Sequence, residues 1–169
     1  ELPLYGTILT NVEVDHLDHH GSFDGIKDSF DRYLAQVPGP KVVSSDDPVA
    51  AELASRHGAL TFGFGADADV RAVDVVACNG AHTFVVTRRR PGLDEPERLG
   101  SIDLPMRGTY NVMNALGAAT MALEIGVDFA SIAAALAKFG GVARRFDIRG
   151  VDRGATFVDD YAHLPTEID

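Results

Sequence analysis

Imidazole and carboxylate side chains crowd one short segment of the sequence. Residues 15–20 read Asp-His-Leu-Asp-His-His and hold three of the six histidines. Carboxylates suit Mg²⁺ or Mn²⁺ and imidazole suits Mn²⁺ or Zn²⁺, so this segment can hold a divalent cation. It directly follows an apolar, β-branched stretch at residues 7–12, which predicts a position at the carboxyl end of a strand. A solvated polar loop that caps the next helix is the other interpretation, and both stay open.

A second candidate site is a pair of asparagines. Asn111 and Asn114 are three residues apart at a predicted helix start. This spacing places both side-chain amides on one face of the helix. An amide offers a hydrogen-bond donor and an acceptor together, which is what an adenine edge requires. The alternative is that Asn111 is only the helix N-cap and Asn114 a polar surface residue.

Two further groups lie near the C-terminal end. Arg144 and Arg145 follow a Gly-Gly pair in a predicted loop, where an arginine can bind phosphate through two parallel hydrogen bonds. Asp159 and Asp160 follow the last predicted strand and suit ribose hydroxyls, a metal or a helix cap. The sequence contains neither Gly-x-Gly-x-x-Gly nor Gly-x-x-x-x-Gly-Lys-Ser/Thr, so it shows no phosphate-binding loop of its own.

The elements that must position these residues alternate between strand and helix in the first third of the chain. Strands are predicted at 7–12, 41–44 and 59–62, with helices at 23–37 and from 46–48 to about Arg56. This alternation is typical of a parallel α/β sheet.

The pattern then changes to antiparallel strands. Stretches 70–77 and 81–87 flank Asn79-Gly80, a strong hairpin signal, and 99–104 supplies a third strand. Two helices, at 112–125 and from Asp128 to the Gly-Gly pair at 140–141, and a strand at 155–158 follow. We therefore expect an α/β fold whose mostly parallel sheet is flanked by helices and carries a small antiparallel insertion.

Composition limits the possible functions. The 169 residues, 46% hydrophobic and 24% charged, suit one domain or one domain plus a piece of another. The net charge of −10 disfavours nucleic acid as a partner. The sequence contains no run of about eighteen apolar residues, so no membrane span is predicted, and no signal peptide is visible. Cys78 is the single cysteine, which excludes a disulfide framework, and these features favour a cytoplasmic setting.

Taken in order, four of these segments resemble the signatures of the Mur ligases, ATP-dependent amide-bond ligases that build the peptide stem of peptidoglycan precursors. Residues 10–18 resemble Thr-Asn-x-x-x-Asp-His-Leu/Met-Asp. Residues 108–115 resemble Gly-x-His-Asn-x-x-Asn-Ala, with Tyr110 in place of the histidine. Residues 144–147 and 159–165 match the later signatures.

Within this family the chain looks most like the alanine-adding branch, on residues 46–49, 67–71 and 144–147. In the later-acting ligases a carbamylated, metal-holding lysine follows the motif histidine, and its position here is Phe30. The close relative of the alanine-adding branch is the murein tripeptide recycling ligase, which stays an alternative. One departure is Leu164, where the alanine-adding signature has a second histidine.

The resemblance implies a P-loop-NTPase-like fold and a division of the chain into two parts. Residues 1–150 correspond to the central ATP-binding domain without its upstream phosphate-loop part, and residues 151–169 to the start of the C-terminal amino-acid-binding domain. The implied reaction adds L-alanine to UDP-N-acetylmuramate through an acyl phosphate, with ATP and Mg²⁺ as cofactors. The present chain by itself is expected to be inactive.

The resemblance also implies roles for individual residues. His16 corresponds to the catalytic Mg²⁺ ligand near the γ-phosphate. Asn111 and Asn114 correspond to the adenine side, Arg145 to the phosphates and Asp160 to the ribose. Tyr161 and His163 correspond to the amino-acid side. His19 and His20 match no functional position.

Two alternatives belong to other classes. Asp18-His19-His20 superficially matches the signature of manganese-dependent Asp-His-His phosphoesterases, although their upstream Asp-rich metal motifs are missing here. The second alternative is that the chain by itself is a folded, non-catalytic fragment of a nucleotide-binding domain.

Overall fold

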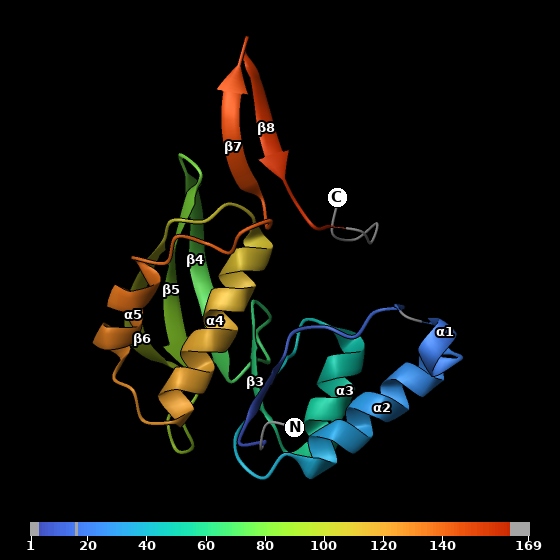
Figure 1. Ribbon diagram of the computed structural model, residues 1–169. Coiled ribbons are helices and arrows are strands. Elements are labelled where there is room, and N and C mark those ends of the chain that lie inside the picture. The colour runs from blue at the N-terminus through green and yellow to red at the C-terminus, as the bar shows by residue number, and fades with distance from the viewer. Residues whose placement is uncertain (1–3, 16, 163–169) are drawn as a thin grey trace.

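A six-stranded sheet in the order β1-β2-β3-β4-β5-β6 organises the chain in the computed structural model, which describes residues 4–15 and 17–162 (Figure 1). Strands β1 to β4 pair in parallel, whereas β5 pairs antiparallel with both β4 and β6. Strand β4 therefore joins the parallel part of the sheet to the antiparallel part. The strands are β1 Thr7–Leu9, β2 Lys41–Ser44, β3 Leu60–Gly63, β4 Val70–Cys78, β5 Ala81–Arg88 and β6 Glu97–Leu104. This arrangement confirms the expected α/β fold with an antiparallel insertion.

Strand β2 is buried on both faces. Val42 and Val43 are adjacent in β2, and both side chains are fully buried. Because successive side chains of a strand point to opposite faces, Val42 packs in the core on one side of the sheet and Val43 in the core on the other. A strand covered on both faces needs a continuous apolar run, which is the pattern that residues 41–44 show.

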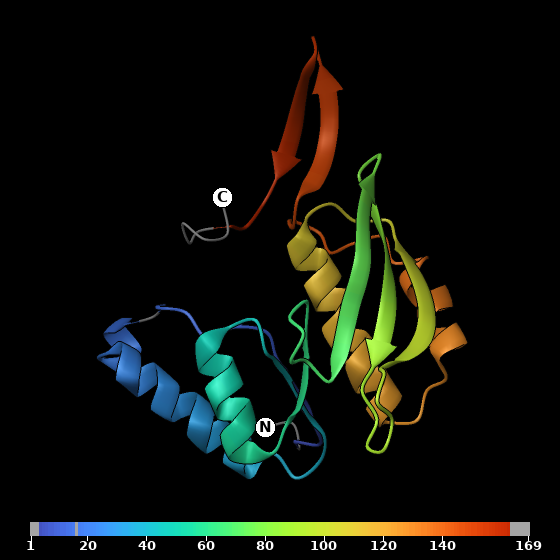
Figure 2. The same ribbon diagram turned by 180° about the vertical axis from the view of Figure 1, so that it is seen from behind.

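Helices cover the two faces separately. Helix α4 (Thr109–Glu124) packs on the face that holds Phe62 and Phe84, and Figures 1 and 2 show it on one side of β4 and β5. Helices α2 (Phe23–Gln36) and α3 (Pro48–His57) enclose the second core around Leu34 and Val43. Helix α5 (Phe129–Leu136) lies against β6, and the short α1 (Leu17–His20) precedes α2.

Side-chain caps fix where most of these helices begin. Ser22 accepts from the backbone N–H of Gly25 to start α2, and Asp47 accepts from that of Ala50 to start α3. Asp128 caps α5 as predicted. This helix ends at Leu136 and not at residues 140–141 as expected, because the N–H groups of Lys138 and Phe139 donate to the carbonyls three residues earlier, Ala135 and Leu136, which tightens and ends the last turn. The first strand is also shorter than expected, ending at Leu9.

The C-terminal part forms a separate two-stranded sheet. Strands β7 (Asp147–Asp152) and β8 (Ala155–Asp159) pair antiparallel and stand away from the rest of the chain (Figures 1 and 2). The sequence predicts β8, whereas it predicts a loop where β7 starts. Apolar side chains of this hairpin face solvent: Val151 is 69% and Phe157 56% exposed. Strand β7 runs across residue 150, the predicted end of the central domain, and the domain division stays a prediction.

Within the described ranges, no helix has the length and apolar character needed to cross a membrane.

Candidate functional site

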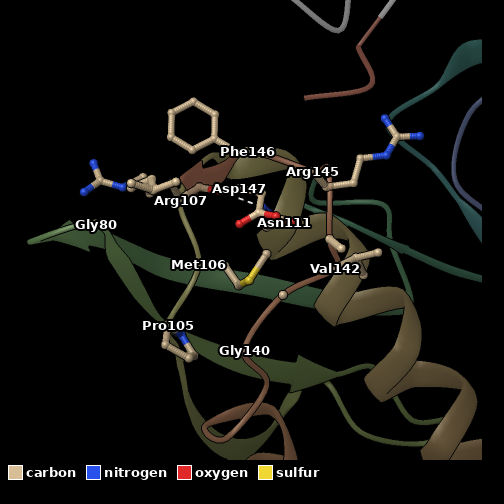
Figure 3. Close-up of a pocket in the computed structure, with 13 residues that line it drawn as sticks. Gly80, Pro105, Met106, Arg107, Asn111, Gly140, Val142, Arg145, Phe146 and Asp147 are labelled. Carbon is tan, nitrogen blue, oxygen red and sulfur yellow. Dashed lines mark hydrogen bonds between the residues drawn. The ribbon is translucent and has the colours of Figure 1, made fainter. Parts of the chain in front are cut away.

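A cavity of about 270 Å³ opens where four segments meet (Figure 3). The segments are the turn between β4 and β5, the β6–α4 connector at residues 105–107, the first turn of α4, and a linker at residues 140–146 together with the first two residues of β7. Two residues singled out from the sequence line it: Asn111 from α4 and Arg145 from the linker. They are far apart in the chain, and the fold brings them to one site.

Asn111 lies at the inner side of this cavity and is half-buried. The N-cap of α4 is Gly108, so the alternative that Asn111 is merely the helix cap is wrong. Its Nδ2 donates to the carbonyl oxygen of Arg107 at 2.7 Å, which fixes the orientation of the amide. Among the described residues nothing donates to its Oδ1, which leaves this oxygen as an acceptor for a ligand.

Asn114 lies one turn further along α4, is exposed and is not among the cavity residues. The two amides therefore do not both line this cavity, although their spacing predicted a common helix face. Asn111, by contrast, has its amide held against the cavity wall by the carbonyl oxygen of Arg107.

The β6–α4 connector supplies cavity residues that the sequence did not single out. Arg107 packs its guanidinium over the β4–β5 turn, where a Cβ on Gly80 would come within 2.8 Å of Cζ. Gly80 has φ +80°, so a side chain there meets both a steric and a backbone obstacle. Met106 faces Gly141 of the linker, with Sδ 3.2 Å from the position of a Cβ. The sequence feature that could have pointed to Met106 and Arg107 is their position directly before the motif at residues 108–115.

The linker holds two non-glycine residues in the left-handed region. Arg144 has φ 62° and Phe146 has φ 49°. Each such residue costs about 1 kcal/mol, and strained backbone of this kind concentrates at functional sites. Hydrogen bonds hold the linker in this shape: Arg144 N–H donates to Asp147 Oδ2 at 3.4 Å, and Tyr161 N–H donates to the Arg144 carbonyl at 2.9 Å.

Asp160 and Tyr161 gather at the same linker. Asp160 accepts from the backbone N–H of Phe146 through Oδ2 and from that of Ala162 through Oδ1. The Tyr161 ring centroid is 5.0 Å from Cζ of Arg144 and 5.9 Å from Cζ of Arg145. These distances allow cation–π attraction. Neither Asp160 nor Tyr161 lines the cavity itself, and both adjoin its outer wall.

Arginines stand on opposite sides of the cavity mouth. Figure 3 shows the side chains of Arg107 and Arg145 pointing away from each other, with Asn111 and Asp147 between them. The mouth thus carries positive charge in a chain whose net charge is −10. Such a local arrangement can attract an anionic ligand against the overall field.

The predicted metal segment is described only in part. His16 and His163 lie outside the described residues. On either side of residue 16 in the sequence, Asn11 Nδ2 donates to Glu13 Oε1 at 2.7 Å, and His20 Nδ1 lies 3.3 Å from Ser29 Oγ. In the ranges 4–15 and 17–162, no three His, Cys, Asp or Glu residues come together as metal ligands.

Phe30 packs against the second core, on the apolar face of α2. This contact confirms the prediction that Phe30 is a core residue.

The comparisons with known proteins agree with this architecture. Residues 2–122 match the family described as Mur ligase middle domain. The chain belongs to the Mur ligase family. A curated UDP-N-acetylmuramate–L-alanine ligase of Rhizorhabdus wittichii is 43% identical over 99% of this Mur ligase chain and 37% of its own length.

Solved Mur ligases share the fold. The UDP-N-acetylmuramate–alanine ligase MurC of Thermotoga maritima is 30% identical, with a TM-score of 0.77 over 96% of this chain and 36% of that one. MurF of Acinetobacter baumannii is 26% identical, with a TM-score of 0.76 over 95% of this chain and 35% of that one. The present Mur ligase chain thus spans little more than a third of the length of these relatives.

Proposed function

We propose that this chain is the ATP-binding central part of a ligase that joins L-alanine to UDP-N-acetylmuramate in peptidoglycan precursor synthesis. The observation that carries the proposal is the cavity in which Asn111 is held by Arg107 and faces the Arg145 linker. The 43% identity to a relative named for this reaction supports the choice of amino acid. Mur ligases are ATP-dependent, which supports a nucleotide as the cavity's ligand.

In this proposal, residues in and beside the cavity each bind a different part of the nucleotide. Asn111 offers Oδ1 to the exocyclic amine of adenine, while its Nδ2 stays on Arg107. Arg145 reaches the phosphates, for which a guanidinium is suited by its charge and paired donors. Asp160 accepts from the ribose hydroxyls, since a carboxylate with two occupied oxygens still has free lone pairs.

The proposed reaction activates a carboxylate. The γ-phosphoryl group of ATP passes to a carboxylate oxygen of the lactyl group, which gives an acyl phosphate and ADP. The amine of L-alanine then attacks the acyl carbon, the carbon–oxygen bond to phosphate breaks, and the nitrogen loses a proton as the amide forms. Such a reaction depends on positioning both reactants and on cations around the transferred group.

Three roles belong to the proposal alone. His16 is its catalytic residue and Mg²⁺ ligand, and His163 lies on its amino-acid side together with Tyr161. Within the described ranges no three His, Cys, Asp or Glu residues come together as metal ligands, and the support for the cation is His16 and the membership of the family. A cytoplasmic setting, where ATP and the nucleotide sugar are available, completes the proposal.

Residues 151–169, which include the end of β7 and all of β8, are proposed to begin the amino-acid-binding domain. Val151 and Phe157 expose large apolar surfaces, which suits packing against further parts of such a domain. Because the chain contains no Gly-x-x-x-x-Gly-Lys-Ser/Thr phosphate-binding loop, it is also expected not to ligate L-alanine by itself and to bind ATP weakly in calorimetry. Micromolar ATP affinity of the isolated chain would contradict this expectation.

The full-length protein tests the function. Phosphate release would be measured with ATP, Mg²⁺ and UDP-N-acetylmuramate, with either L-alanine or L-Ala-D-Glu-meso-diaminopimelate as the acceptor. We expect release with L-alanine. A preference for the tripeptide would instead assign the recycling reaction, and release with neither would reject both.

A further inference from the structure

A buried histidine lies directly behind the cavity. His82 of β5 is only 7% exposed, and its Nδ1 lies 2.8 Å from the carbonyl oxygen of Met106. A carbonyl oxygen only accepts hydrogen bonds, so Nδ1 is the nitrogen that carries the proton. Nδ1 therefore donates to the Met106 carbonyl whether or not Nε2 also carries a proton.

The surroundings of His82 are otherwise apolar. It shares the α4-facing side of β5 with Phe84 and Val86, both fully buried, and pairs across the sheet with Leu104 at the end of β6. A polar ring at such a position is costly unless it is hydrogen-bonded. Its bond goes to neither strand but to the connector that follows β6.

This connector carries much of the cavity wall. Met106 N–H donates back to the Leu104 carbonyl at 2.8 Å, so the chain turns at this point. The next carbonyl, that of Arg107, accepts from Asn111 Nδ2, and the Arg107 guanidinium covers Gly80. A displacement of the Met106 peptide would therefore move the acceptor that orients the Asn111 amide.

We propose that His82 is a positioning residue of the nucleotide site. Its Nδ1–H holds the Met106 carbonyl and thereby sets the place of Arg107 and the orientation of Asn111. The inference rests on the proposed function, in which Asn111 binds the adenine.

Two polar substitutions test the inference. His82→Asn keeps an N–H donor near the position of Nδ1, whereas His82→Gln moves the donor to the position of the other ring nitrogen. In the full-length protein we expect His82→Gln to raise KM for ATP about tenfold, the effect of one lost hydrogen bond, with KM for L-alanine unchanged. His82→Asn should stay within about threefold of the unsubstituted protein.

A matched control lies on the same strand. Thr83 is exposed and donates to Asp103 at 2.9 Å, so Thr83→Val removes a hydrogen bond on the face away from the cavity. We expect this control to leave KM for ATP unchanged. Equal KM values for His82→Asn and His82→Gln, raised or not, would overturn the inference.

Hydrogen exchange without nucleotide gives a readout that does not depend on activity. The amides of residue 104 and of residues 106–111 should exchange faster in His82→Gln than in His82→Asn or Thr83→Val. If the unsubstituted protein failed to use ATP while this difference appeared, the proposed function would fail and the positioning of the connector by His82 would stand. No difference in exchange would reject the positioning role itself.

Discussion

The backbone N–H of Phe146 donates to the carboxylate of Asp160 at 3.1 Å, which ties the linker beside the cavity to the segment that follows β8. The donor belongs to a residue with φ 49°, so this hydrogen bond stabilises a backbone conformation that is otherwise unfavourable. Asp160 thus acts on the cavity wall even though it does not line the cavity.

Replacing Asp160 tests this connection. Asp160→Ala removes the acceptor for both Phe146 and Ala162, so we expect the linker to relax and KM for ATP in the full-length protein to rise about tenfold. Asp159→Ala is the control, since Asp159 pairs with Arg149 at 2.9 Å within the hairpin. An equal effect of both substitutions would argue against a specific role of Asp160.

The two asparagines of α4 should differ in importance. Asn111 lines the cavity, so Asn111→Ala should raise the dissociation constant for ATP about tenfold, measured by calorimetry on the full-length protein. Asn114 is exposed outside the cavity, and Asn114→Ala should change the constant by less than about threefold. The reverse order of effects would show that the adenine lies on another part of the helix.

Stability near α2 and α3 should depend on pH through Asp31. Its hydrogen bond to the His57 ring at 2.8 Å, aided by Arg56 at 3.0 Å, holds the pKa of the Asp31 carboxyl below its usual value. A lowered pKa in the folded state means that the contribution to stability is present above the ordinary value of about 3.9 and is lost as the pH falls through the lowered pKa.

We therefore expect Asp31→Asn to lower Tm near neutral pH and to have no effect in strong acid, where the carboxyl is protonated. Thermal unfolding of both proteins across this pH range measures the difference. Asp28→Asn on the same helix is the control and should show a smaller dependence. A constant difference in Tm at every pH would exclude the ionised carboxylate as its source.

Gly117 should resist replacement although it lies inside a helix. Glycine within a helix usually costs about 1 kcal/mol relative to alanine. Here a Cβ would stand 2.9 Å from Cζ of the fully buried Phe62 ring, so α4 could not approach the sheet as closely. We expect Gly117→Ala to lower Tm, whereas exposed Ala118→Gly should show only the helix-propensity cost. A higher Tm for Gly117→Ala would show that the ring moves aside freely.

Helices and strands were predictable from the sequence where residues close in the chain determine where the element begins or ends. Helix α3 begins where expected because Asp47 caps it and Pro48 follows, and the β4–β5 hairpin forms around Asn79-Gly80. Strand β7 was missed because Asp147–Asp152 contains charged residues and Gly150 and interrupts its pairing after Ile148. Regular alternation, the usual signal of a strand, is therefore absent from it.

The site was predictable only in those residues that belong to a motif. Asn111 and Arg145 were found because residue type and order marked them. Arg107 and Gly80 line the same cavity through a contact between a turn and a connector, which depends on the pairing of β4, β5 and β6. His82 belongs to no sequence motif, and its proposed role depends on the hydrogen bond between its ring and the Met106 carbonyl, which only the structure shows.

The exposed β7–β8 hairpin also affects how the chain behaves on its own. Each of its two strands has an outer edge that pairs with no other strand in the described part of the chain, and Val151 and Phe157 lie beside those edges. Unprotected edges with apolar side chains favour pairing between molecules. When the chain is expressed alone, this hairpin is the segment expected to drive self-association as the protein is concentrated. We expect Val151→Lys to reduce this self-association, and Val151 is not among the residues that line the cavity.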